Sequence, residues 1–97
     1  MILSFLNQGT EDVFNGKNTR QARKVCPASI SRVAVRKLDQ INAATSLDDL
    51  RAPPHNRLEA LTGDRFGQHS IRINDQYRIC FTWSDAGASD VEIVDYH

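Results

Sequence analysis

The apolar residues of this chain change their spacing once, close to residue 57, and this change constrains the fold more than any other feature. Between residues 27 and 44 they recur at helical spacing, which predicts one amphipathic main helix with Pro27 in its first turn. After that point they alternate, which predicts strands at residues 57–61, 68–73, 76–83 and 91–96. Helices followed by a strand meander indicate an α+β fold, with the N-terminal helices packed on one face of a mainly antiparallel, twisted sheet.

The other segments are shorter and give weaker signals. A length of 97 residues suits a single domain that spans residues 1–97. We expect a first strand at residues 1–6, one or two helical turns at 10–15 capped by Thr10, and an exposed connection at 16–24, which lacks apolar periodicity. Ser46 is expected to cap a short turn that ends before the two prolines that follow it.

The register of the two central strands bears on chemistry. Their apolar side chains can share one face only if the connecting loop has an odd number of residues. A loop at 74–76 pairs Ile71 with Ile79 and places Arg72 opposite Arg78, on the face away from the main helix. Opposed like charges are unfavourable, so the pair is either screened by acids or kept to bind an anion such as a phosphodiester. Glu59, the candidate acid, shares a face of the preceding strand with Arg57 and Leu61.

Three titratable side chains end the chain. Asp95, Tyr96 and His97 follow a strand whose apolar residues hold it in the sheet, so their position is expected to be fixed. Tyrosine and histidine can accept or donate a proton beside an RNA phosphate, and an aspartate can orient either. The alternative is a polar tail, because most chain ends fray.

Charge is balanced overall but uneven along the chain. Twelve bases and twelve acids give a formal net charge of zero, which argues against non-specific binding of nucleic acid. Seven bases and no acid lie between Lys17 and Lys37, whereas ten acids and five arginines follow from Asp39. The basic stretch, which includes Arg32, Arg36 and Lys37, is either a solvated helix surface or a contact for an anionic partner, and the acidic remainder suits a cationic partner on another surface.

Several classes of protein are excluded by composition. No apolar run is long enough to cross a bilayer, and two acids stand where a signal peptide would be cleaved, so we expect a cytoplasmic protein that uses no membrane. Cys26 and Cys80 belong to no CxxC pair or Cys/His set, which argues against structural zinc and a disulfide framework. Cys80 is expected to fill space rather than to act as a nucleophile.

Two segments carry a family resemblance. GDRFGQHSIRINDQYRICF at residues 63–81 and the terminal VDYH resemble the HigB-type host-inhibition toxins of the RelE superfamily. MILSF at the start, NAAT at the end of the main helix and the LDDL turn extend the similarity over nearly the whole chain, and RLEAL at residues 57–61 is most similar to the GraT-like subset.

The resemblance implies a compact RelE-like α+β fold and the toxin of a type II toxin–antitoxin module. It implies a ribosome-dependent messenger-RNA endonuclease without metal or organic cofactor, and a helix-turn-helix (HigA-type) antitoxin that neutralises the toxin and represses their operon. Operator DNA would be bound only through the complex. The candidate contacts with ribosomal RNA are Arg32, Arg36 and Lys37 in the basic stretch. The positions that match the phosphate-holding arginines of the family are Arg72 and Arg78, and those that match its terminal Asp-Tyr-His are Asp95, Tyr96 and His97.

One motif departs from the family pattern. Many HigB-type toxins read L-H-P-L followed by lysine before the G-D-R turn, whereas this chain has Leu58-Glu59-Ala60-Leu61 and then Thr62. The general base therefore stays open between Glu59 and Tyr96, with His97 as the acid, Asp95 as the orienting group and Arg57 as an RNA contact. The strength of the activity also stays open. The runner-up is a non-catalytic inhibitor that binds the ribosome, and a DNA-binding regulator is weaker because no helix-turn-helix pattern is present.

Overall fold

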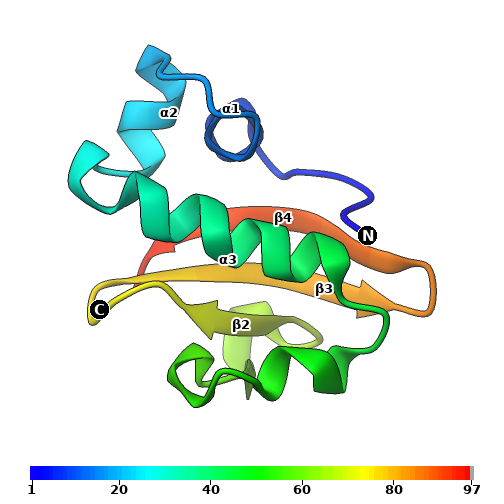
Figure 1. Ribbon diagram of the computed structural model, residues 1–97. Helices are drawn as coiled ribbons and strands as arrows, with labels where there is room; N and C mark the ends of the chain where they lie inside the picture. Colours follow the sequence, from blue (N-terminus) through cyan, green and yellow to red (C-terminus); the bar gives the residue numbers. More distant parts are fainter. Residues whose placement is uncertain (97) are drawn as a thin grey trace.

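The computed structural model describes residues 1–96, in which three α-helices precede a four-stranded sheet (Figure 1). The helices are α1 (Gln8–Phe14), α2 (Arg20–Val25) and α3 (Ser31–Ala43). The strands are β1 (Glu59–Ala60), β2 (His69–Arg72), β3 (Tyr77–Ser84) and β4 (Gly87–Asp95). Short 3-10 turns join them: η1 (Ala28–Ile30), η2 (Leu47–Arg51), η3 (Pro54–Asn56) and η4 (Gly63–Arg65). The α+β prediction is confirmed.

The sheet is an antiparallel meander in the order β1-β2-β3-β4. In its β2–β3 hairpin, Ile71 lies opposite Ile79 and Arg72 lies opposite Arg78. This is the register predicted from the odd loop length. The loop closes because the side chain of Asn74 accepts hydrogen bonds from the backbone N–H groups of Gln76 and Tyr77, at 2.9 and 2.7 Å. Such a bond pattern is an Asx turn, which explains why asparagine suits this position.

Helix α3 lies across one face of the sheet and closes the core (Figure 1). Its apolar stripe is buried against inward-facing residues of all three longer strands. The core side chains with less than 2% exposure include Leu38, Ile41, Leu50, Ile71, Ile79, Phe81 and Val91. Because side chains alternate along a strand, the residues between them point to the opposite face of the sheet, which none of the helices in the described residues covers.

The N-terminal segment joins the edge of β4 but is too irregular to be a strand. Ile2 and Phe5 form isolated parallel bridges with Ala88 and Val91. The prediction of a regular strand at residues 1–6 is therefore wrong, although the segment does enter the sheet. Gly87 explains the close approach, because a Cβ there would lie 2.2 Å from the carbonyl oxygen of Met1.

Helices α1 and α2 differ from the sequence prediction. Helix α1 begins earlier than expected, because Asn7 and not Thr10 is its N-cap and accepts a bond from the Thr10 N–H at 2.8 Å. The predicted exposed connection contains helix α2, whose N-cap is Thr19. The two helices pack closely through Gly9, where a Cβ would lie 2.5 Å from the carbonyl oxygen of Gln21.

Strand lengths also differ from the prediction. Strand β1 covers two residues instead of five, because Arg57 adopts a left-handed conformation that ends η3 and delays pairing. Strand β4 starts at Gly87 instead of residue 91, because Gly87, Ala88 and Ser89 also pair with β3. None of the helices in residues 1–96 combines the length and the apolar character needed to span a membrane.

Candidate functional site

The face of the sheet opposite α3, here called the outer face, carries polar and charged side chains in two rows. Glu59, Ser70, Cys80 and Glu92 are paired in one row across all four strands. The next row contains Arg72 and Arg78. Residues paired across an antiparallel ladder lie on the same side, so the register itself brings these groups together.

One end of the outer face forms a pocket of about 380 Å³, here called the arginine pocket. Its lining combines three arginines, two acids, an amide and a phenol: Arg57, Arg72, Arg78, Glu59, Asp75, Asn74 and Tyr96. Five of these seven side chains are charged, which suits a small, strongly polar anionic group better than an apolar ligand.

Arg78 is the most rigidly held of the pocket residues. Only 9% of its surface is exposed, and its Nε donates to Ser70 Oγ at 2.7 Å. Its Nη2 donates to the carbonyl oxygen of Arg57 at 2.7 Å and lies 3.4 Å from that of Ser70. Within residues 1–96, Nη1 makes no hydrogen bond to the protein, so it remains a donor for a bound anion. A guanidinium fixed in this way needs little reorganisation when a phosphate arrives.

Arg57 contributes its backbone as well as its side chain. The residue has φ 45° and ψ 57°, in the left-handed region that costs a non-glycine residue about 1–2 kcal/mol. Its carbonyl oxygen accepts the bond from Arg78, and its own side chain is exposed at the pocket. The predicted RNA contact at Arg57 therefore lies beside Arg78.

Arg72 is more accessible than Arg78. Its side chain is 26% exposed and forms an ion pair with Asp75, which is 95% exposed in the hairpin loop. Asp75, rather than Glu59, is therefore the acid that screens Arg72. Exposed pairs of this kind are weak and can exchange partners, so a phosphate can compete with Asp75 for the guanidinium.

The candidate proton-transfer groups are placed around the same arginines. One carboxylate oxygen of Glu59 lies 4.0 Å from Nη2 of Arg78. Tyr96 lines the pocket with 41% of its surface exposed, and its backbone N–H donates to the carbonyl of Gln76 at 2.6 Å. Asp95 accepts a bond from Gln76 Nε2 at 3.2 Å and is not among the pocket residues. His97, the predicted acid, lies outside the described residues.

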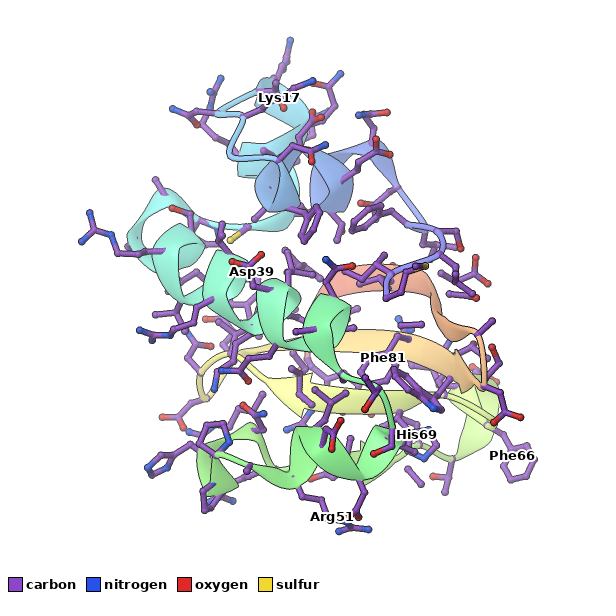
Figure 2. The ribbon with its side chains drawn as sticks, turned by 45° about the vertical axis from the view of Figure 1, so that its right-hand side comes forward. Lys17, Asp39, Arg51, Phe66, His69 and Phe81 are labelled. Carbon is purple, nitrogen blue, oxygen red and sulfur yellow. The ribbon has the colours of Figure 1, made fainter. Side chains whose placement is uncertain are left out.

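The predicted ribosome contacts lie on the other side of the molecule. Arg32 and Arg36 are exposed on α3, which covers the face opposite the arginine pocket. Lys17, in the loop before α2, projects from the end of the molecule opposite Arg51 (Figure 2). The fold therefore does not join the basic stretch of the sequence to the arginine pocket.

Lys37 corrects one prediction, because it is buried. Only 7% of its surface is exposed, and its Nζ donates to Asn56 Oδ1 at 2.5 Å. Burial, with a smaller contribution from the charge of Arg36, lowers the pKa of the Lys37 ammonium group. Asn56 in turn donates to Gln40 Oε1 and to the Leu50 carbonyl, so this network fixes the η2–η3 segment against α3. Lys37 is thus a structural residue and not a surface contact.

Cys80 also lies on the outer face, next to Ser70 and Glu92. Burial raises the pKa of the Cys80 thiol, which keeps it protonated at neutral pH, as expected for a residue that fills space. In residues 1–96, no three His, Cys, Asp or Glu side chains cluster so as to hold a metal ion.

The sequence did not identify three residues that shape the site. Ser70 positions Arg78, while Asn74 and Asp75 line the pocket from the hairpin loop. The signal for Ser70 was available, since its small polar side chain occupies the outer-face position between Glu59 and Arg72 in the predicted register.

Comparison with known proteins identifies the family. Residues 3–97 match the profile of a family described as RelE-like toxin of type II toxin-antitoxin system HigB. The chain belongs to the HigB-like toxins. It is 39% identical over 88 residues to Toxin HigB-1 of Vibrio cholerae, an alignment that covers 91% of this chain and 90% of that protein. The recognition made from the sequence motifs is therefore confirmed.

Two further relatives of this HigB-like toxin were found. A Haemophilus influenzae protein described as uncharacterised is 41% identical over 59 residues, which cover 61% of this chain and 58% of that protein. The fold is similar to a chain of the YoeB-YefM complex from Staphylococcus aureus, with a TM-score of 0.60, 14% identity and coverage of 100% and 98%. At that identity the likeness shows the fold alone, and it confirms the RelE-like architecture.

Proposed function

We propose that this HigB-like toxin is a ribosome-dependent messenger-RNA endonuclease whose active site is the arginine pocket. The observation that carries the proposal is the meeting of Arg72 and Arg78 with Glu59 and Tyr96 on one uncovered sheet face. These residues supply both the cations and the titratable groups that RNA cleavage requires. The reaction proposed is attack of a 2′-hydroxyl on the adjacent phosphate, which gives a 2′,3′-cyclic phosphate and a 5′-hydroxyl, without a metal or organic cofactor.

The two arginines have complementary tasks in this proposal. The buried Arg78 is held by Ser70 and the Arg57 carbonyl, so it offers a preorganised donor to the extra negative charge of the phosphorane-like transition state. Arg72 releases Asp75 and binds a second phosphate oxygen. Arg57, exposed at the pocket, contacts the neighbouring backbone of the RNA.

Proton transfer is assigned to the side chains around the arginines. Glu59 or Tyr96 removes the 2′-hydroxyl proton, and His97 protonates the leaving 5′-oxygen. Asp95, at the end of β4, orients the terminal residues.

The proposal includes the partners of the toxin. Membership of a type II family supports an antitoxin, for which we propose a helix-turn-helix protein that carries any contact with operator DNA. The ribosome presents the message, since a chain of zero net charge has little general attraction for free RNA. Arg32 and Arg36 on α3 are the proposed contacts with ribosomal RNA. A cytoplasmic location, where messages are translated, belongs to the same proposal.

Primer extension on one defined message tests the function. Wild-type toxin and Arg72→Ala are compared in a cell-free translation mixture and on the same RNA without ribosomes. The proposal expects new 5′ ends only with wild-type toxin and only with ribosomes. Cleavage that is unaffected by Arg72→Ala would remove the pocket from the mechanism.

A second function is favoured by one observation. Many HigB-type toxins have a histidine in the segment before the G-D-R turn and a lysine just before its glycine. This chain has Glu59 and Thr62 at those positions. A toxin without catalysis could inhibit translation by occupying the ribosome. In the primer-extension experiment such an inhibitor would stop synthesis and leave the message intact.

A further inference from the structure

Phe66 is an aromatic side chain with no place in the core or in the arginine pocket. It is 84% exposed, the highest value among the large hydrophobic residues exposed in residues 1–96. Of the seven aromatic residues of the chain, only Phe66 and Tyr96 are exposed, and Tyr96 already lines the pocket. A single exposed phenylalanine needs no explanation by itself, so its meaning depends on the groups around it.

The backbone around Phe66 holds the ring out of the fold. The residue follows η4 and lies between Gly63 and Gly67, whose φ values of 64° and 94° form a tight loop between β1 and β2. The backbone N–H of Phe66 donates to the Gly63 carbonyl at 3.1 Å, which closes the turn. Figure 2 shows the ring projecting from the molecule beyond the end of the sheet that carries His69.

Arg65 connects this loop to the outer face. Its guanidinium donates to Gln68 at 3.1 Å and forms an ion pair at 3.2 Å with Glu92, an outer-face residue of β4. Its charge is also close enough to lower the pKa of the Cys80 thiol, against the larger effect of burial. Arg65 is 31% exposed, so its guanidinium, held at the outer-face residue Glu92, is accessible to a ligand.

One end of β2 therefore carries an aromatic and a basic side chain, and the other end carries two arginines and a tyrosine. Phe66 and Arg65 lie at one end, and Arg72, Arg78 and Tyr96 at the other. Strand β2 separates them, and its four residues span roughly 10 Å at about 3.3 Å per residue. Single-stranded nucleic acid is bound by this combination, because cations follow the phosphates while aromatic rings stack on the bases.

We propose that Phe66 and Arg65 form a nucleobase-stacking subsite for the message, a few nucleotides away from the phosphate held in the arginine pocket. This inference rests on the proposed function, because it needs RNA to lie on the outer face. Phe66 stacks on one base without reading its sequence, since every base has a π-face. Arg65 binds the adjoining phosphate after exchanging Glu92 for it.

A base fits Phe66 better than a protein surface does. The other exposed large hydrophobics in residues 1–96, apart from Tyr96, are Met1, Leu3 and Leu6 in the N-terminal segment. That segment joins β4 at one edge of the sheet, whereas Phe66 lies in the loop between β1 and β2 at the other edge. A single flat ring beside a guanidinium matches one base and one phosphate, whereas protein interfaces bury a larger continuous area.

Binding of short RNA to the full-length toxin tests the subsite without reliance on cleavage. The probe is fluorescein-labelled hexa-adenylate, read by fluorescence anisotropy, together with copies that carry one abasic nucleotide. We expect Phe66→Ala to raise the Kd by about 5- to 100-fold, as for loss of one stacked base. Phe66→Trp is expected to retain wild-type affinity and Phe66→Leu to bind as weakly as Phe66→Ala. Leu6→Ala, which removes an exposed apolar side chain of the N-terminal segment, is the matched control and should have no effect.

The abasic probes identify the stacked base. One abasic position should reproduce the loss seen with Phe66→Ala, and the variant should lose nothing further on that probe. Equal affinity of wild type, Phe66→Ala and Phe66→Leu would overturn the subsite. If the wild type does not bind the free probe, the same three proteins are compared for binding to ribosomes that carry the message, and equal affinity there would overturn it. Wild-type affinity of Phe66→Leu would indicate a contact with protein and would overturn it as well.

The binding experiment and the cleavage experiment can fail separately, so failure of the subsite can be told apart from failure of the endonuclease proposal. Binding that depends on Phe66 in a protein that cuts no message would keep the subsite and reject the enzyme. Cleavage that depends on Arg72 with RNA binding insensitive to Phe66 would do the reverse.

Discussion

Arg72→Ala and Arg78→Ala are expected to reduce message cleavage alike but to differ in their effect on folding. Removal of one preorganised electrostatic partner costs about 2.7–4 kcal/mol of transition-state stabilisation, or roughly 10²- to 10³-fold in rate. Both arginines point into the same pocket, so both variants are expected to fall in this range.

The difference in stability follows from how each guanidinium is held. Arg78 makes two hydrogen bonds of 2.7 Å, to Ser70 Oγ and to the Arg57 carbonyl. A bond from a charged donor contributes about 1.5–3 kcal/mol. The loss of both bonds in Arg78→Ala should therefore lower the free energy of unfolding by about 3 kcal/mol or more. Arg72 has one ion pair, to the exposed Asp75, which is worth about 0–1 kcal/mol.

Thermal unfolding and time-resolved primer extension measure the two effects separately. In a domain of this size about 1 kcal/mol shifts Tm by roughly 4–8 °C, so Arg78→Ala should melt at least about 10 °C below wild type. Arg72→Ala should melt within a few degrees of it. Arg51→Ala is the matched control, because Arg51 also pairs with an aspartate three residues away but lies outside the pocket.

Two results would refute this reasoning. The first is Arg72→Ala that cuts at the wild-type rate in a folded protein, since the pocket would then play no part in cleavage. The second is an Arg78→Ala variant with the same Tm as Arg72→Ala, since the bonds to Ser70 and the Arg57 carbonyl would then contribute nothing to stability.

Three further predictions concern the helical layer. Gly9→Ala should lower the free energy of unfolding in urea by about 1–3 kcal/mol, because its Cβ meets the Gln21 carbonyl; an unchanged value would contradict the close packing of α1 and α2. The hydrogen bonds from Thr19 and Gln8 lower the pKa of Asp12, so its stabilisation is complete above about pH 4 and lost as pH falls through the folded-state pKa. Acid titration should therefore show a smaller loss of stability for Asp12→Asn, and a parallel titration of both proteins would disprove it. Lys37→Ala should destabilise the fold by about 1–3 kcal/mol through Asn56 yet bind ribosomes normally in sedimentation, whereas reversal of charge at Arg32 and Arg36 should weaken that binding. If Lys37→Ala kept its stability and bound ribosomes more weakly, Lys37 would be a surface contact instead.

The central hairpin could be predicted because its constraint is local. Alternation of apolar residues and the parity of one loop were enough to place Arg72 opposite Arg78. Alternation in the preceding strand suggested Glu59 as an acid near the two arginines, and in the structure its carboxylate oxygen lies 4.0 Å from Nη2 of Arg78. Pairing places residues of neighbouring strands side by side, so the correct register of this hairpin brought Arg72 and Arg78 together in the pocket.

The errors arose where contacts are non-local or the apolar signal is weak. Helix α2 buries only Ala22, so no apolar stripe marks it, although Thr19 was a readable N-cap. Lys37 was taken for a surface base because its partner, Asn56, lies 19 residues away in a 3-10 turn. The anchoring of Arg78 by the Arg57 carbonyl depends on a positive φ at a non-glycine residue, which no pattern in the sequence indicates.

The central claim is that the outer face cuts RNA through attack of a 2′-hydroxyl, and a single deoxy substitution tests it most directly. A message is cut on ribosomes by the wild-type toxin, the position is mapped, and the message is then made with 2′-deoxyribose at the nucleotide preceding the break. The account predicts that cleavage at that position disappears, and that the upstream fragment of the all-ribose message ends in a 2′,3′-cyclic phosphate by mass spectrometry. Continued cleavage of the deoxy message at the same position would contradict it.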